Sequence, residues 1–126
     1  AGVACLNYYK EVNILENVNK SGKVLGDVLE AIKVSHKCVG DVRYIGLFSA
    51  VELVKSKDTR EPLVPYNKDP DGIMGKLIGK LKSKGFMTYS HENMILISPP
   101  LIITEEQVRE EMSKLDEVLS ELDMQI

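Results

Sequence analysis

The spacing of apolar residues predicts helices in the first and middle parts of the chain. Over residues 5–15 and 24–32, apolar side chains recur at the period of one helix face. Two helices are therefore expected to open the chain. A third is expected to begin at Ile73 and to stop at Gly85, since glycine readily adopts the left-handed conformation that ends a helix.

A fourth helix near the end has the clearest start signal. Thr104 and Gln107 form a Thr-x-x-Gln capping box, in which both side chains bond backbone groups that the first turn leaves free. Apolar residues then recur along one face: Val108, Met112, Leu115, Leu119 and Leu122. Charged residues fill the other positions, so one face is expected to pack on a core and the other to meet water.

Between the helices, the pattern changes to that of strands and a loop. Residues 39–54 are rich in β-branched and apolar side chains and alternate in their second half, which predicts two strands. Residues 55–72 are polar and contain prolines and an Asp-Pro-Asp-Gly cluster, which predicts a surface loop.

Two short apolar runs near the end of the chain predict a hairpin. Residues 86–89 and 94–97 are separated by the polar residues 90–93, which suit a turn. Pro99 and Pro100 then remove two backbone donors, so the chain must leave the sheet there. The order of these elements predicts an α+β fold with two layers, in which helices cover a mostly antiparallel sheet.

The composition indicates one globular domain over residues 1–126. Apolar residues make up 44% and charged residues 28%, and no apolar run could span a membrane. A net charge of −3 with scattered basic residues argues against nucleic acid as a partner. Cys5 and Cys38 form no CxxC pair, so a reducing, cytoplasmic setting is expected. The chain opens at Ala1 without a signal segment, which suggests either a processed terminus or a start within a longer protein.

Residue types alone indicate little chemistry. His36 and His91 are far apart, with no Cys, Asp or Glu evident at ligand spacing, so both are expected at the surface and no metal site is predicted. Residues 75–80 contain glycine and lysine but lack P-loop spacing and follow the period of a helix. No Ser-His-Asp or Cys-His set is legible.

Two segments carry the sequence motifs that say most about this chain. Residues 40–47, Gly-Asp-Val-Arg-Tyr-Ile-Gly-Leu, with Glu-Leu-Val at 52–54, resemble a strand motif in the C-terminal small domain of one enzyme family, the class III pyridoxal-phosphate-dependent aminotransferases. Residues 98–106 resemble its Pro-Pro-Leu-x-Ile-Thr segment, which opens the final helix. Residues 14–18 and the Lys-Gly step at 84–85 are also similar, so the resemblance covers nearly the whole chain.

The resemblance implies a division of labour between domains. The large domain of such enzymes supplies the lysine that holds pyridoxal phosphate and the acidic residue that pairs with the pyridine nitrogen, and nothing in residues 1–126 matches either. The chain is therefore expected to be a small domain that binds no cofactor and is inactive alone. In the intact protein, the resemblance implies amino transfer from an amine or amino acid to a keto acid, contact with the large domain, and a homodimer.

Five residues are the candidates for a wall of the substrate pocket. Arg43 occupies the arginine of the Gly-Asp-Val-Arg motif, where it is expected either to hold its strand through charge-assisted hydrogen bonds or to be a purely structural surface residue. Pro99 and Pro100 match the proline pair of the family and are expected to fix the crossing beside the pocket. Tyr89 and His91 lie in the hairpin and are expected to line the pocket, one or both.

Three positions depart from the family pattern, and two of them bear on the substrate. Leu96 stands where ornithine-type members carry an arginine three residues before the proline pair. The hairpin residues 89–93 also contain no arginine. Both features make an ornithine-type substrate doubtful and resemble pyruvate-using members that accept amines or ω-amino acids. Tyr44 adds bulk where the family usually has glycine.

A second hypothesis keeps the fold but not the chemistry: a stand-alone binding or dimerisation module. Exposed apolar surface distinguishes the two. A small domain that belongs against a larger one is expected to expose an apolar patch around Leu6, Tyr9 and the proline loop, whereas a free module would have a polar surface.

Overall fold

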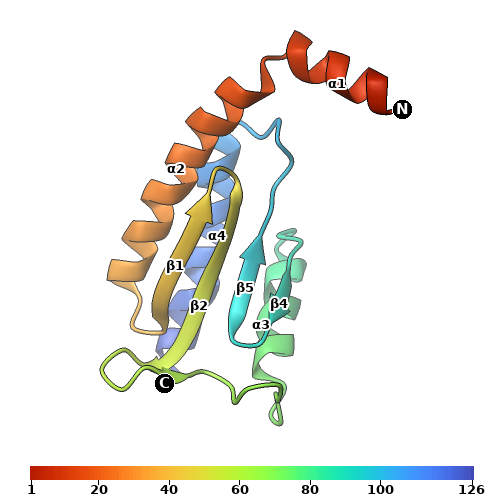
Figure 1. The fold of residues 1–126 in the computed structure, drawn as a ribbon. Coiled ribbons are helices and arrows are strands. Elements are labelled where there is room, and N and C mark those ends of the chain that lie inside the picture. The colour runs from red at the N-terminus through yellow and green to blue at the C-terminus, as the bar shows by residue number, and fades with distance from the viewer.

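The computed structural model describes residues 1–126 and has two layers, with helices packed on one face of an antiparallel sheet (Figure 1). The elements follow the order α1 (Gly2–Glu11), α2 (Ile14–Ser35), β1 (Val39–Ile45), β2 (Phe48–Ser56), β3 (Glu61–Pro62), α3 (Ile73–Ser83), β4 (Tyr89–His91), β5 (Met94–Ile97) and α4 (Glu105–Asp123). The predicted α+β fold class is confirmed. No helix combines the length and apolar character needed to cross a bilayer.

The sheet brings together strands that are far apart in the sequence. Its strand order is β1-β2-β5-β4, and the short β3 pairs with the far end of β2. All pairings are antiparallel. The hairpin β4–β5 therefore adds to the β1–β2 hairpin through β5, and α2 packs against both β1 and α4 (Figure 1).

One core of 24 buried residues holds the layers together. The apolar face predicted for α4 is confirmed, since all five of its predicted residues are buried, and Val118 joins them. Leu25 and Leu29 of the neighbouring helix α2 and Val51 of β2 belong to the same core. Each fully buried aliphatic side chain of this kind contributes about 1.5–3 kcal/mol.

The predicted boundaries of the hairpin were wrong in detail. The hairpin lies where expected, but its first strand begins at Tyr89, and the turn consists of Glu92 and Asn93 alone. The polar residues Ser90 and His91 belong to the strand because β4 is an edge strand with few neighbours to bury them. Phe86 lies outside the strand and instead enters the core.

The segment 55–72 is not wholly a surface loop. It contains β3, and Leu63 and Val64 directly after it are buried. The Leu63 amide donates to the carbonyl of Leu53 at 3.0 Å, which fastens the segment to β2. Because this segment is rich in prolines and polar residues, its sequence pattern predicted a loop and did not reveal β3.

The predicted capping box of α4 is confirmed. The amide of Gln107 donates to Thr104 Oγ1 at 3.1 Å, and the amide of Thr104 donates to Gln107 Oε1 at 3.0 Å. Replacing Thr104 by alanine should lower the free energy of unfolding by about 1 kcal/mol, because one helix donor loses its partner. Equilibrium urea unfolding measures this loss. Thr104→Ser keeps the hydroxyl and should stay near the wild type; equal losses in both variants would show that the cap is not the cause.

Candidate functional site

The open face of the sheet carries three of the five predicted pocket residues. Arg43 lies opposite Ala50, Ala50 opposite Leu96, and Leu96 opposite Tyr89. Directly opposed residues of antiparallel strands point to the same side of the sheet, so this row crosses one face from edge to edge. His91 lies two residues beyond Tyr89 and therefore shares that face.

This face is turned away from the helices. Val51 and Ile95 of the neighbouring row are fully buried on the side of the helices, whereas the row of Arg43 and Tyr89 is partly or fully open. Arg43 and Tyr89 are three strand spacings apart, or about 14 Å. They can thus line one wall together but do not touch each other.

Arg43 is held by two carboxylates. Its Nη1 lies 2.8 Å from Glu52 Oε2 on β2 and 3.1 Å from Asp41 Oδ2 on its own strand. The side chain is half exposed, so these ion pairs contribute at most about 1 kcal/mol. Their clear effect is on geometry, since they tie β1 to β2 and fix the guanidinium over the open face. The structure thus gives Arg43 the charge-assisted contacts that were expected, while its role in a pocket stays a prediction.

Tyr89 and His91 project from the edge strand β4 without partners. Neither side chain makes a hydrogen bond within the chain, and both are exposed. Polar groups that nothing in the domain engages are available to a substrate or to another surface. Their assignment to a pocket wall stays a prediction.

The proline crossing is anchored by α2. After Pro100 the chain turns, and Asn17 Nδ2 donates to the carbonyls of Leu101 at 2.7 Å and Ile103 at 3.0 Å. The hydroxyl of Ser21, which is fully buried, donates to the same Ile103 carbonyl at 2.8 Å. Neither anchor was predicted from the sequence. The only indication in the sequence was that Asn17 and Ser21 are small polar residues on an otherwise apolar face of the helix.

A pocket of about 260 Å³ lies beneath this crossing. Leu25, Ile97, Val108 and the two prolines are among its mostly apolar lining residues. It lies on the side of the helices, whereas the row of Arg43 and Tyr89 lies on the opposite face. The structure therefore separates the five predicted residues into an open-face group and a crossing group.

No lysine of the chain fits the role of holding pyridoxal phosphate. Such a lysine needs a lowered pKa, which burial away from carboxylates provides. Here the only buried polar or charged side chains are Ser21, His36 and Ser49. Hydrogen bonds to neighbouring carboxylates raise the pKa values of Lys33 and Lys84, which is the opposite direction. The residues present thus do not form a cofactor site by themselves.

The prediction of a surface position for His36 was wrong. Its side chain is buried at the end of α2, with Cys38 and Asp123 close enough that one ligand atom from each lies within 4.8 Å of the others. Sequence spacing could not show this, because Asp123 comes from α4, more than eighty residues later. Every buried side-chain nitrogen and oxygen nevertheless has a hydrogen-bond partner within the chain. Burial also raises the pKa of the Cys38 thiol, which favours its protonated form.

The predicted apolar patch is confirmed. Helix α1 buries none of its residues and projects beyond the rest of the domain (Figure 1). Leu6 is 61% exposed and Tyr9 40%, while Leu101 and Ile102 of the proline loop are 40% and 56% exposed. The contact of Asn17 with Leu101 brings that loop to the same end of the molecule as the start of α2. Helix α1 and the proline loop thus expose several large apolar side chains, although others, such as Val34, Tyr66 and Met124, are exposed elsewhere.

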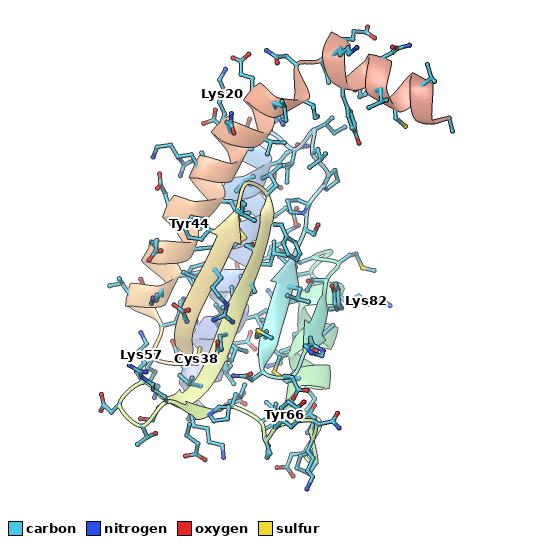
Figure 2. The ribbon with its side chains drawn as sticks, viewed as in Figure 1. Lys20, Cys38, Tyr44, Lys57, Tyr66 and Lys82 are labelled. Carbon is cyan, nitrogen blue, oxygen red and sulfur yellow. The ribbon has the colours of Figure 1, made fainter.

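Tyr44 fills space that a helix glycine leaves free. Its ring lies against α2 (Figure 2), where a Cβ on Gly26 would come within 2.6 Å of the Tyr44 Cε2 atom. The Tyr44 hydroxyl donates to Glu30 Oε1 at 3.2 Å. The bulk at this position thus packs against the helix layer and not over the open face.

Comparison with known proteins identifies relatives along almost the whole chain. The family described as "Aminotransferase class-III" matches residues 1–119. The crystal structure of taurine:2-oxoglutarate aminotransferase from Bifidobacterium kashiwanohense, in complex with PLP and glutamate, is 45% identical with a TM-score of 0.92 and covers 98% of this chain and 27% of its own. Acetylornithine aminotransferase from Caldanaerobacter subterraneus is 34% identical over 97% of this chain and 27% of its own length.

A third relative carries a different activity in its name. Ethanolamine-phosphate phospho-lyase homolog 1 from Caenorhabditis elegans is 32% identical and covers 95% of this chain and 25% of its own length. The chain thus spans about a quarter of the length of the relatives it matches. The resemblance first seen in two short motifs extends to the fold and along almost the whole length of the chain, and the chain belongs to the class III aminotransferase family.

Proposed function

We propose that the protein containing this chain is a pyridoxal-phosphate-dependent aminotransferase that moves an amino group from an amine or ω-amino acid to a keto acid. The observation that carries the proposal is the match to taurine:2-oxoglutarate aminotransferase, at 45% identity and a TM-score of 0.92 over 98% of the chain. That relative holds PLP and glutamate. The cofactor supplies the means of storing the amino group between donor and acceptor.

In this proposal the chain acts as the small domain. Its open face, with Arg43, Tyr89 and His91, forms one wall of the substrate pocket, and closure of the domain excludes water and orients the substrate. The exposed apolar surface of α1 and the proline loop is covered by the large domain of the same protein. We also propose that the whole protein is a homodimer and acts in the cytoplasm.

The donor class follows from the charges on the open face. Arg43 is the arginine there, and Asp41 and Glu52 already neutralise it. Leu96, in the centre of the same row, offers no charge to a substrate carboxylate. A donor whose α-carboxylate needs a free arginine from this domain is therefore disfavoured, whereas an amine or an ω-amino acid is compatible.

A substrate panel on the whole protein tests the activity. Taurine and other ω-amino acids, each paired with pyruvate or 2-oxoglutarate, should be consumed, and N-acetylornithine should be a poor donor. Formation of the new amino acid, followed by chromatography, measures the transfer. Preference for N-acetylornithine would contradict the donor class but not the family chemistry. Release of phosphate from ethanolamine phosphate without amino transfer would indicate a lyase instead.

The chain alone should form no specific covalent adduct with pyridoxal phosphate. None of its lysines is buried, so none combines a lowered pKa with a pocket. After incubation and borohydride reduction, mass spectrometry should find at most scattered, partial labelling, whereas the whole protein should carry one label on one lysine. A single fully labelled lysine within residues 1–126 would refute the proposed division between domains. A whole protein that neither binds the cofactor nor transfers amino groups would favour the non-catalytic binding or dimerisation module.

A further inference from the structure

His36 joins two helix ends through both of its ring nitrogens. It follows the last residue of α2, and its Nδ1 lies 2.7 Å from Asp123 Oδ2 while its Nε2 lies 2.9 Å from Asp116 Oδ1. Both carboxylates belong to α4 and are two helical turns apart, so the imidazole fits between them. The backbone amide of Cys38 also donates a hydrogen bond to Asp123 Oδ1 at 2.8 Å. The Asp123 carboxylate therefore holds both His36 and the residue just before β1.

This arrangement favours an imidazolium ion. A neutral imidazole has one N–H and one lone pair, so one of its nitrogens would direct a lone pair at a carboxylate oxygen. When the ring is protonated, both nitrogens donate and both contacts become charge-assisted hydrogen bonds. The C-terminal end of α2 adds a favourable partial negative charge beside the cation.

The other charged groups of this corner leave the pairing intact. Lys37 donates to the carbonyl of Ile126 at 2.7 Å, and Lys57, at the same end of the molecule as Cys38 (Figure 2), donates to the carbonyl of Lys33. Because its thiol pKa is raised by burial, Cys38 stays neutral. Asp116 and Asp123 are thus the two anions that face His36 directly.

We propose that His36 is a proton-dependent clasp that holds the C-terminal ends of α2 and α4 together and loosens when the ring loses its proton. This role is independent of the proposed enzymatic function. It makes the stability of the corner opposite the proline crossing depend on pH, through one buried side chain.

The direction of the dependence follows from the two partners. Burial alone would lower the pKa of His36, but hydrogen bonds and charges from Asp116 and Asp123 outweigh it, so the pKa is raised. The contribution of His36 is therefore complete below the ordinary histidine pKa of about 6.5 and is lost as the pH rises through the value of the folded state. For Asp123, burial would raise the pKa, but bonds from Cys38 and His36 outweigh it and lower the pKa. Its contribution is complete above about pH 4 and is lost as the pH falls through the folded-state value.

Histidine NMR combined with urea unfolding tests the clasp. The chain has two histidines, so His91→Gln leaves His36 as the single titrating imidazole. The pH midpoint of the His36 titration should lie above that of a histidine in an unfolded peptide. By linkage, the unfolding equilibrium constant should rise about tenfold between pH 6 and high pH for each unit by which this midpoint is raised. The shift of the NMR midpoint and the pH dependence of the unfolding equilibrium constant must agree.

Matched substitutions locate the cause. Asp116→Asn removes one carboxylate at an exposed position, so the fold should survive while the His36 midpoint falls and the pH dependence shrinks. Asp27→Asn removes an exposed aspartate paired with Lys23 on α2 and should change neither. His36→Gln should abolish the loss of stability at alkaline pH. If this variant does not fold, the comparison of Asp116→Asn with Asp27→Asn still tests the proposal.

Two results would overturn the proposal. One is a His36 midpoint at or below the ordinary value, or one that Asp116→Asn leaves unchanged. The other is a rise in melting temperature on adding zinc that Cys38→Ala removes, because a metal and not a proton would then bridge His36, Cys38 and Asp123.

Discussion

Replacing Leu115 by alanine should lower the free energy of unfolding by about 3 kcal/mol. Leu115 is fully buried in the centre of the apolar face of α4, where the helix meets the core shared with α2 and the sheet. Truncation removes buried apolar atoms, and the surrounding helices and strands cannot move in to fill the space. The free-energy cost of the cavity therefore adds to that of the lost burial. Urea unfolding, followed by circular dichroism, measures the loss as a lower midpoint with an unchanged slope.

An exposed leucine provides the control. Leu15 lies near the start of α2 and is 73% exposed, so Leu15→Ala should change stability by less than about 0.5 kcal/mol. Similar losses at both positions would mean either that the core is packed differently or that Leu15 is covered by a second molecule. Repeating the measurement at several protein concentrations separates these causes, since only the second depends on concentration.

Gly22→Ala should lower the free energy of unfolding by about 2 kcal/mol. A Cβ at position 22 would lie 2.7 Å from the carbonyl oxygen of Gly46 and 2.8 Å from its carbon. Both are backbone atoms in the turn between β1 and β2, and Gly46 itself has a φ of 56°, so that turn cannot move aside easily. The clash should outweigh the gain of about 1 kcal/mol that alanine normally brings to a helix interior.

A second helix glycine makes the matched control. Gly79 lies within α3 and is exposed, and a Cβ added there would meet no atom within 4 Å. Gly79→Ala should therefore raise stability by up to about 1 kcal/mol, opposite in sign to Gly22→Ala. If both substitutions stabilise, α2 does not approach the β1–β2 turn as closely as these distances require.

Local patterns in the sequence predicted most of the elements. The capping box of Thr104 and Gln107 located the start of α4 because it depends only on neighbouring residues. The proline pair correctly marked the end of β5 for the same reason. The bounds of β4 were missed because an edge strand needs no apolar alternation, and the polar Ser90 and His91 therefore matched a turn equally well.

The candidate site was predictable only as a set of residues. The resemblance to a family selected Arg43, Tyr89 and His91, but their common face depends on β5 pairing with β2, a long-range register that no local pattern contains. The anchoring of the proline crossing by Asn17 is equally non-local, since the two segments are more than eighty residues apart. The prediction for His36 failed for the same reason, because its partners come from the last helix.

Helix α1 has ten residues and buries none of them. Isolated helices shorter than about 12–15 residues are marginal in water, because the cost of nucleation is not recovered over so few turns. Its apolar residues therefore cannot secure its helical form from within the domain. If the large domain covers α1 as proposed, docking of that domain would therefore also complete the folding of this segment.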